Sequence, residues 1–490
     1  MSIADERRAG ILLHVTSLPG GVGNGDLGAE AYRFVEFLAA SRVTVWQVLP
    51  LGPTHGDGSP YQCLSVHAGN PLLINLEWLQ GRGWLEPPEM ESADDSGAYR
   101  RRCLQRAYQG FLALASEAEQ QELEEFSSRH ADWLDDFSLY MALRHEQGEQ
   151  EWSCWPEPLR DRRPEALEQA RKRLADEIDS IRFQQYLFFR QWQELRDYAR
   201  RLGVLLFGDM PIFVAHDSAE VWAHRKYFSV DEHGRAERVA GVPPDYFSAT
   251  GQLWGNPLYR WERMREDGFS WWIGRMRTQL ELFDFVRIDH FRGFEACWEI
   301  PGNAETAMEG RWVKAPGEEL LGALYDAFHT LPLVAEDLGV ITPEVDALRN
   351  RFGLPGMKVL QFAFGGDATN PYLPHNHETK AVVYTGTHDN DTTLGWYAAL
   401  GDAEKRHISD YLGCPSEQMP WPLIRAALAS VACLAMLPLQ DVLELGGEHR
   451  MNTPGTTEGN WRWRFGWDQV ATDLPSRLSH LVRLYGRDGA

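Results

Sequence analysis

Eight short runs of β-branched and aliphatic residues recur along the chain. Each run ends in a polar or Pro/Gly cluster and is followed by a segment with helical periodicity, which is the pattern of a repeated strand–helix unit. Eight such units are what a closed parallel barrel requires, and its strands are buried on both faces, which explains why the runs lack polar alternation. The runs are ILLHVTSLP from Ile11, VTVWQVLPL from Val43, VLLFGDMPIFV from Val204, FVRIDHF from Phe285, LVAEDLG from Leu333, MKVLQFAF from Met357, AVVYTGTHD from Ala381 and LAMLPLQDV from Leu434.

The predicted fold class is therefore α/β: residues 1–490 form a single (β/α)8 TIM barrel with inserted subdomains, one of them mainly helical. The uneven spacing of the runs locates two insertions. Residues 65–202 form the insertion between the second and third strands. Its stretch from Ala98 to Leu202 is rich in Ala, Glu, Arg, Gln and Leu with apolar residues at i, i+3 and i+4, and this pattern predicts helices. Residues 215–283, between the third and fourth strands, form the other insertion.

The second insertion carries the segment GVPPDYFSATGQLWGNP, residues 241–257. Its Pro, Gly, Asp and Asn content argues against a long helix or strand, so we expect a loop. Loops longer than about 12–15 residues in a compact domain tend to be functional. This one carries Tyr246, Phe247 and Trp254, and we expect it to be part of the active site.

The charge balance and the cysteines indicate which ligands and which cellular compartment the chain is suited to. There are 48 Lys and Arg against 71 Asp and Glu, a net charge of −23, which repels nucleic acids and anionic membranes but not a neutral ligand. The N-terminus is polar and no run of 18 or more apolar residues occurs, so neither a signal peptide nor a membrane span is predicted. The six cysteines show no CxxC spacing, which predicts a cytoplasmic protein without disulfides or zinc. No cluster of ligand residues indicates a metal, and the Gly-rich stretch from Gly20 lacks the Lys and the spacing of a phosphate-binding loop, so neither a metal nor another cofactor is expected.

Three of the runs end in acids: Asp289 on the fourth strand, Glu336 on the fifth and Asp389 after the seventh. The carboxyl ends of barrel strands form one mouth, so these acids should converge there. A lone acid at such a place can equally be a helix N-cap or a partner in a structural ion pair. Three together favour catalysis.

Acids packed at one mouth cannot all stay ionised cheaply, so one is expected to keep its proton near neutrality while another stays charged. This division suits glycosidic bond cleavage, in which a protonated carboxyl serves the leaving oxygen and an ionised one attacks the anomeric carbon. Arg287 lies two residues before Asp289 on the same strand face and should favour its ionised form. Structural ion pairing for Arg287, and structural hydrogen bonding for His290 and His388, are the alternatives.

Longer blocks of sequence carry a family resemblance that covers essentially the whole chain. RIDHFRGF from Arg287, AEDLG from Ala335 and THDNDTTLGW from Thr387 resemble the signature blocks of the 4-α-glucanotransferases of the α-amylase clan, called amylomaltases or disproportionating enzymes. Further similar blocks are SPYQ from Ser59, AGNPLLI from Ala68, GVPPDYFSATGQLWGNPLY from Gly241, QDVLELG from Gln440 and MNTPGTTEGNWRWR from Met451.

The resemblance implies a retaining enzyme that moves a segment of a 1,4-α-D-glucan to the 4-hydroxyl of an acceptor. Asp289 is then the nucleophile that becomes glycosylated, Glu336 the acid/base and Asp389 the stabiliser of the transition state. The partners implied are maltooligosaccharides and α-1,4-glucans, with glucose as an acceptor. The implied sugar contacts are Ser59, Tyr61, Asp209, Gln252, Trp254, Arg287, His290, Asp367, His388, Asp391 and Asn460.

Three positions depart from the family pattern: Cys63 and His67 stand where a small hydroxyl and an aromatic are usual, and Val15 replaces a common Pro. The chain starts near the first strand, so it resembles the compact form without an N-terminal extension. Two alternatives stay open from the residues themselves. The three acids would equally serve an intracellular α-glucan hydrolase, because both reactions share one covalent intermediate, and a barrel that had lost its activity would be a glycan-binding protein.

Overall fold

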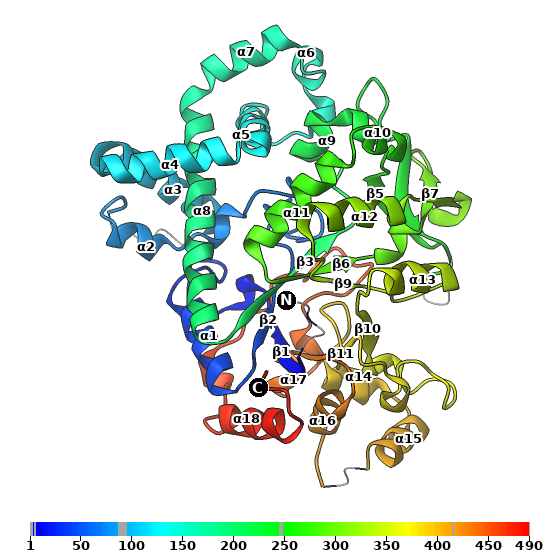
Figure 1. The fold of residues 1–490 in the computed structure, drawn as a ribbon. Helices are drawn as coiled ribbons and strands as arrows, with labels where there is room; N and C mark the ends of the chain where they lie inside the picture. The colour runs from blue at the N-terminus through cyan, green and yellow to red at the C-terminus, as the bar shows by residue number, and fades with distance from the viewer. Residues whose placement is uncertain (1–2, 4–5, 87–95, 245–247, 414–415, 490) are drawn as a thin grey trace.

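The structure, a computed structural model, describes residues 3, 6–86, 96–244, 248–413 and 416–489. Each of the eight predicted runs overlaps a strand of one parallel sheet, so the predicted fold class is confirmed (Figure 1). In chain order the barrel strands are β1 (Arg8–Leu12), β2 (Val45–Gln47), β3 (Leu205–Pro211), β6 (Phe285–Asp289), β9 (Leu333–Ala335), β10 (Gly356–Val359), β11 (Ala381–Tyr384) and β12 (Leu434–Pro438).

The sheet curls into a nearly closed barrel. Its hydrogen-bonded order is β10-β11-β12-β1-β2-β3-β6-β9, which follows the chain once around the ring. The two ends of this order meet where the backbone N–H of Ala335 on β9 donates to the carbonyl of Pro355 just before β10, at 2.8 Å. All eight strand ends therefore point to one mouth, which is where parallel barrels hold their functional side chains.

Both faces of the barrel wall are buried, as the apolar runs predict. Along β1 the side chain of Ile11 packs against the outer helices whereas that of Leu12 packs inside the barrel. The barrel interior is filled from every strand, with Phe207, Phe285 and Met436 among its members. Gly10 is required for this filling, because a Cβ there would stand 2.3 Å from the sulfur of Met436.

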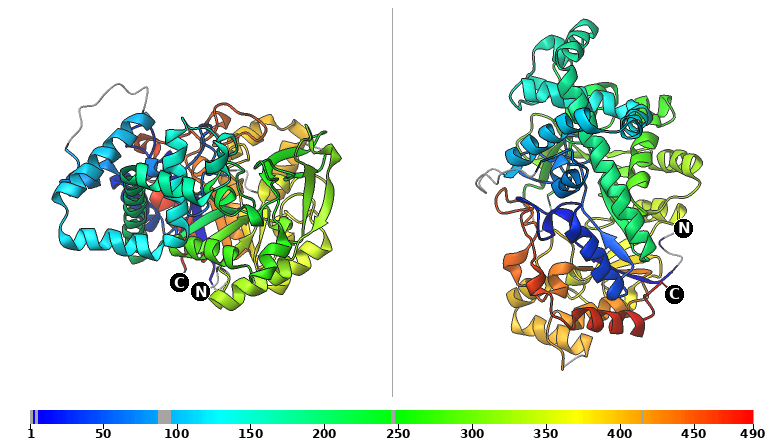
Figure 2. Two further views of the ribbon diagram at one scale, coloured as in Figure 1. Left: turned by 90° about the horizontal axis from the view of Figure 1, so that it is seen from above. Right: turned by 90° about the vertical axis from the view of Figure 1, so that its left-hand side faces the viewer.

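Helices dominate the chain between β2 and β3. α8 is 27 residues long, begins with Asp176 and Glu177 and ends with Arg200 and Arg201, so its charges complement the helix dipole. It runs from the other helices of this region down to the barrel, where it lies beside α1 (Ala29–Ala40). Those other helices lie at the end of the molecule opposite the last helices of the chain (Figures 1 and 2). The division into a barrel with insertions at 65–202 and 215–283 stays a prediction. The helices of this region are α2 (Leu76–Gly81), α3 (Ser96–Leu114), α4 (Glu117–Arg129), α5 (Ala131–Glu146), α6 (Glu157–Arg160), α7 (Pro164–Arg173) and α8 (Ala175–Arg201).

The prediction of a loop over residues 241–257 is wrong at both ends, where residues 241–242 and 252–257 belong to strands. A second, antiparallel sheet of order β5-β4-β7-β8 includes β4 (Arg238–Val242) and β5 (Gln252–Pro257), so only residues 243–251 connect the two strands. The Gly and Pro residues are tolerated because β5 is an edge strand and Pro257 lies at its end. The other two strands, β7 (Ala296–Pro301) and β8 (Arg311–Lys314), were not predicted. Tyr246 and Phe247 of the predicted loop lie outside the described residues.

The remaining helices cover the outside of the barrel and the small sheet. The first and last parts of the described chain lie close together, since Arg8 forms an antiparallel bridge with Asp488 (Figure 2). No helix within the described ranges combines the length and the apolar character that crossing a bilayer requires. These helices are α1 (Ala29–Ala40), α9 (Ala219–Ala223), α10 (Trp261–Glu266), α11 (Ser270–Leu282), α12 (Gly317–Phe328), α13 (Pro343–Arg351), α14 (Thr393–Ala399), α15 (Asp402–Leu412), α16 (Trp421–Ala429), α17 (Leu439–Val442) and α18 (Leu474–Leu484).

Candidate active site

Asp289 and Glu336 are neighbours across two paired strands. Ile288 on β6 is opposite Ala335 on β9, and each acid is the next residue along its strand. The backbone N–H of Glu336 donates to the carbonyl of Ile288 at 3.0 Å, which extends the pairing to the level of the acids. Adjacent strands lie about 4.8 Å apart, so the register brings both acids to the same edge of the mouth as neighbours.

A buried guanidinium joins β3 to β6. Nη1 of Arg287 donates to both carboxylate oxygens of Asp209, at 2.8 and 2.7 Å, and Nη2 donates to Oδ1 of Asp289 at 2.8 Å. Burial opposes the charge of Arg287, but Asp209 and Asp289 together outweigh it and raise its pKa well above the ordinary value. A fixed cation therefore faces Asp289, as the alternation along the strand predicts.

The backbone holds Glu336 from two sides. His290 has a left-handed conformation, with φ of 56°, and this turn directs its N–H to Oε2 of Glu336 at 2.7 Å. The N–H of Leu338 donates to Oε1 at 2.9 Å. Burial raises the pKa of Glu336 to about 7, and the charge of Asp289 acts in the same direction against the effect of Arg287. Glu336 is therefore the acid that keeps its proton near neutrality.

Tyr61 connects this wall to the opposite side of the mouth. Its hydroxyl donates to Oδ2 of Asp209 at 2.8 Å and lies 3.4 Å from Nδ1 of His388, whose ring stacks on that of Tyr61 at 5.0 Å. Nε2 of His388 lies 3.3 Å from Oδ1 of Asp389. One continuous series of contacts thus runs from Asp389 through His388, Tyr61, Asp209 and Arg287 to Asp289.

The edge strand β5 contributes an aromatic side chain to the mouth. Trp254 meets the ring of His290 edge-on at 4.8 Å, and its indole N–H donates to Gln252 at 3.1 Å. Ser59 accepts from the N–H of Tyr61 at 3.4 Å. These residues, all named from the sequence, therefore lie around the acids.

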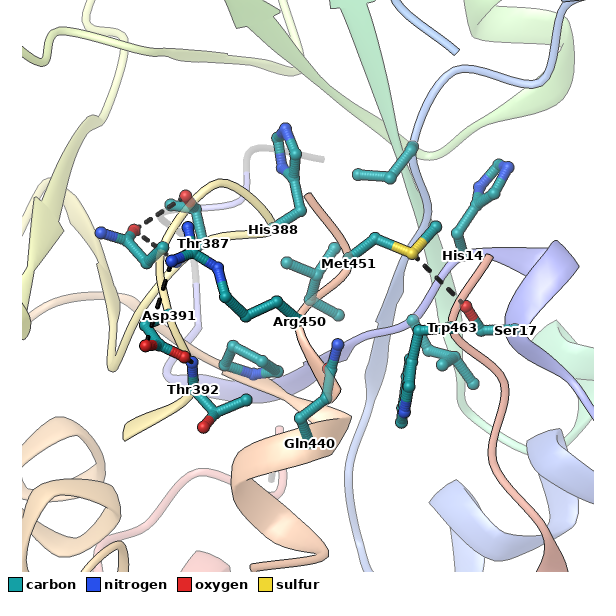
Figure 3. Close-up of a pocket in the computed structure, with 15 residues that line it drawn as sticks. His14, Ser17, Thr387, His388, Asp391, Thr392, Gln440, Arg450, Met451 and Trp463 are labelled. Carbon is teal, nitrogen blue, oxygen red and sulfur yellow. Dashed lines mark hydrogen bonds and ion pairs between the residues drawn. The ribbon is translucent and has the colours of Figure 1, made fainter. Parts of the chain in front are cut away.

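Three other residues named from the sequence have mainly local contacts. Asp367 accepts two hydrogen bonds from Thr369 in an exposed turn, and Asn460 accepts one from the N–H of Thr453 inside its own loop. Asp391 accepts from the N–H of Thr392 at 2.8 Å and lines a cavity beside His388 (Figure 3). Nothing in the described part of the chain joins these three side chains directly to Asp289 or Glu336.

Two cavities flank the series of contacts. The cavity of Figure 3 lies between the ends of β1, β11 and β12 and is lined by His14, His388, Arg450 and Trp463, among others. The second lies behind Tyr61 and Asp209 and reaches two of the unusual positions, Cys63 and His67. His67 is buried and stacks on Trp133 at 5.7 Å, so it is part of the wall behind the site. Across the described residues, no group of three or more His, Cys, Asp or Glu is arranged for a metal ion.

Sequence reasoning missed two residues that contact Asp389. Asn452 donates to its carboxylate and Arg450 donates to its backbone carbonyl. Arg450 immediately precedes the block from Met451 and Asn452 is the second residue of that block, so the available signal was a polar loop with two Asn residues, of which the sequence analysis named Asn460.

The chain is similar to known proteins over nearly its whole length. The family model of glycoside hydrolase family 77, described as 4-alpha-glucanotransferase, matches residues 13–469. The chain is 53% identical to a 4-alpha-glucanotransferase of Thermus thermophilus, covering 98% of this chain and 97% of that one, and 50% identical to one of Synechocystis sp., covering 99% and 98%. It is similar in structure to the amylomaltase of Streptococcus agalactiae in complex with acarbose, with a TM-score of 0.94, 36% identity, and 98% and 100% of the two chains covered. The chain belongs to glycoside hydrolase family 77 and is a 4-alpha-glucanotransferase.

Proposed function

We propose that Asp289 is the nucleophile of this transferase, Glu336 its general acid and base, and Asp389 the stabiliser of the transition state. The observation that carries this proposal is the series of contacts that links the acids through Tyr61 and Arg287, with a buried, backbone-bound Glu336 beside Asp289. The substrates would be maltooligosaccharides and other α-1,4-glucans as donors, with glucose or a glucan as acceptor.

In the first half-reaction, a carboxylate oxygen of Asp289 attacks the anomeric carbon while Glu336 gives its proton to the departing glycosidic oxygen. The bond between the anomeric carbon and the glycosidic oxygen breaks, the reducing-end segment leaves with that oxygen as its new 4-hydroxyl, and the other segment is held as an ester of Asp289. In the second half-reaction the ionised Glu336 removes the proton of an acceptor 4-hydroxyl, whose oxygen displaces Asp289. Two inversions restore the α configuration.

Arg287 suits the first half-reaction because it bonds Asp289 through Oδ1 only, at 2.8 Å, which leaves the other oxygen for the sugar. Positive charge develops on the sugar ring in the transition state, and Asp389 on the opposite side is able to stabilise it. We assign sugar contacts to Ser59, Tyr61, Asp209, Gln252, Trp254, Arg287, His290, Asp367, His388, Asp391 and Asn460, of which Asp367 and Asp391 have the least support from geometry.

We also propose a reducing compartment, the cytoplasm, for this chain. The support is that Cys63, Cys103, Cys154, Cys297 and Cys433 are free thiols, of which three are buried.

The roles of Asp289 and Glu336 are tested by the stereochemistry of rescue. Asp289→Ala and Glu336→Ala should each lower turnover of maltotriose by orders of magnitude, because several kcal/mol of barrier depend on such groups. With α-maltotriosyl fluoride and azide, Asp289→Ala should give the inverted β-azide and Glu336→Ala the retained α-azide. The opposite pairing of products would exchange the roles of Asp289 and Glu336. Near-normal turnover in either variant would contradict the role proposed for the residue that was replaced. Unchanged circular dichroism establishes that both variants fold.

The products of maltotriose test the reaction itself. A ladder of longer and shorter maltooligosaccharides is the expected result. Shorter products alone would indicate the hydrolase, and no change would indicate the binding protein.

A further inference from the structure

The segment after β12 returns to the barrel mouth as a closed loop, residues 450–463. Its two sides are joined where the N–H of Trp461 donates to the carbonyl of Met451 at 2.8 Å and the N–H of Thr453 donates to Asn460 at 2.9 Å. Met451 is buried, and its sulfur accepts from the hydroxyl of Ser17 at 3.7 Å (Figure 3). The base of this loop is therefore anchored in the core.

Two side chains of the loop hold Asp389. Nδ2 of Asn452 donates to Oδ1 of Asp389 at 2.6 Å, and Nη2 of Arg450 donates to the backbone carbonyl of Asp389 at 2.9 Å. Nε of Arg450 also donates to the backbone carbonyl of Asn452 at 3.2 Å, which ties the side chain of Arg450 to the backbone of Asn452. The guanidinium reaches Asp391 as well, with 3.9 Å between Nη1 and Oδ2 (Figure 3).

Asp389 needs such support because no strand provides it. β11 ends at Tyr384, five residues earlier, whereas Asp289 is itself part of β6. The side chain of Asp389 is 48% exposed, against 30% for Asp289, and its backbone N–H donates to the hydroxyl of Thr387 at 3.3 Å rather than to a neighbouring strand. A half-exposed carboxylate on a loop samples several rotamers, and an effective transition-state group must be fixed beforehand.

The chemistry of Asn452 fits a positioning role. Its amide is neutral, so it orients the carboxylate without cancelling the charge, and it occupies only Oδ1, which leaves Oδ2 for a sugar hydroxyl. The cation of Arg450 contacts the backbone rather than the carboxylate, so the charge of Asp389 stays available. The other titratable neighbour, His388, approaches the same Oδ1 at 3.3 Å.

We propose that Asn452 and Arg450 are positioning residues, which hold Asp389 in its catalytic orientation and thereby make the loop 450–463 part of the catalytic apparatus. This inference rests on the proposed role of Asp389. It predicts that damage to Asn452 lowers kcat much more than it raises KM, because the interaction with Asp389 matters in the transition state.

The test compares Asn452→Ala and Asn452→Asp in the full chain, with maltotriose as substrate. Asn452→Ala should lower kcat by between about tenfold and a hundredfold, the range expected from misplacing a catalytic group, with KM within about twofold. Asn452→Asp should be worse at low pH, since two carboxyls in contact share a proton and the acid limb of the pH profile must then move to higher pH. Asn303→Asp makes the same chemical change at an exposed turn and should leave the rate and the profile unaltered.

The outcomes separate this inference from the proposed function. If Asp389→Asn is inactive while both Asn452 variants keep normal kcat and an unmoved acid limb, Asp389 is catalytic and the positioning role is wrong. If Asp389→Asn is active, the proposed role of Asp389 fails and the positioning role fails with it. A rise in KM alone for Asn452→Ala would make Asn452 a substrate contact and would also overturn the proposal. Thermal unfolding of each variant establishes that the measured protein is folded.

Discussion

The two sides of the barrel mouth hold their acids in different ways. On the β3–β6 side, Asp209 is fully buried and Asp289 is part of a strand, and one guanidinium bonds both. On the β11 side, Asp389 is half-exposed, belongs to a loop and depends on an amide from another loop. On the strand side, burial and the ion pairs with Arg287 hold the charged groups in place. On the loop side, side-chain contacts set the orientation of the Asp389 carboxylate.

This difference agrees with the two tasks of the site. A nucleophile must stand at a defined position in every cycle, and strand register supplies that position at no further entropic cost. The opposite carboxylate must meet a long glucan that enters and leaves, so exposure at the mouth is an advantage there. The comparison leads to different expectations for stability, for pH and for the choice of acceptor.

The largest expected effect separates the two arginines. Arg287→Met leaves Asp209 and Asp289 facing each other without a cation, which should cost roughly 3–5 kcal/mol of the free energy of unfolding and nearly all activity. Arg450→Met removes a side chain that is 26% exposed and whose carboxylate contact is as long as 3.9 Å, so the loss of stability should stay below about 1 kcal/mol. Urea unfolding at pH 7 measures both.

Equal destabilisation by the two substitutions would break the comparison, since it would mean that the loop side is as tightly coupled to the fold as the strand side. Arg450→Lys keeps the positive charge but loses the planar guanidinium with its several N–H donors, so its loss of stability should lie between those of the wild type and Arg450→Met.

An effect of intermediate size is expected from pH. Glu336 must carry a proton to serve the leaving oxygen, and burial raises its pKa to about 7. As the pH rises above that value the protonated fraction falls about tenfold for each pH unit, so kcat/KM for maltotriose should fall with the same slope. Below pH 7 this group is in its active form and does not limit the rate. The measurement is kcat/KM between pH 5 and 9.

The chain contains a matched control for this limb. Burial also raises the pKa of Glu220 to about 7, but its carboxylate accepts a hydrogen bond from Ser65 behind the site. Glu220→Gln should therefore keep the alkaline limb where it was. Loss of the limb in Glu220→Gln would show that Glu336 is not the group that titrates.

The same contrast explains what could be predicted from the sequence. The strands and the acids attached to them were found because apolar runs repeat and because strand ends share a mouth, so Asp289, Glu336 and Arg287 required only local reasoning. Asn452 and Arg450 lie some 60 residues from Asp389 in the chain, and no periodicity connects the two loops. Contacts between loops depend on the tertiary fold and leave no local pattern.

The prediction of a loop over residues 241–257 failed for a related reason. Residues 241–257 have the composition of a loop, yet Gly241 pairs with Leu253 and Val242 with Gln252 as strands. Edge strands accept Gly and Pro, and their partners here include β7, which comes from a distant part of the chain. The pairing of β4 with β5 and β7 therefore outweighed the loop propensity of the segment, and the sequence of the segment alone does not indicate that pairing.

The smallest expected effect concerns the acceptor. Trp254 stands edge-on to His290 beside the acids, and we expect it to reduce the access of water to the glycosylated Asp289. Trp254→Ala should then lower the ratio of transfer to hydrolysis several-fold, because water and the acceptor compete for the same glycosylated Asp289 in the second half-reaction. The ratio follows from free glucose and from the oligosaccharide ladder formed from maltotriose.

Trp312→Ala removes a tryptophan of the same sheet that contacts Arg292 instead, and should leave the ratio as it is. An unchanged ratio in Trp254→Ala would mean that discrimination against water comes from acceptor binding alone, and the edge strand would then belong to the scaffold.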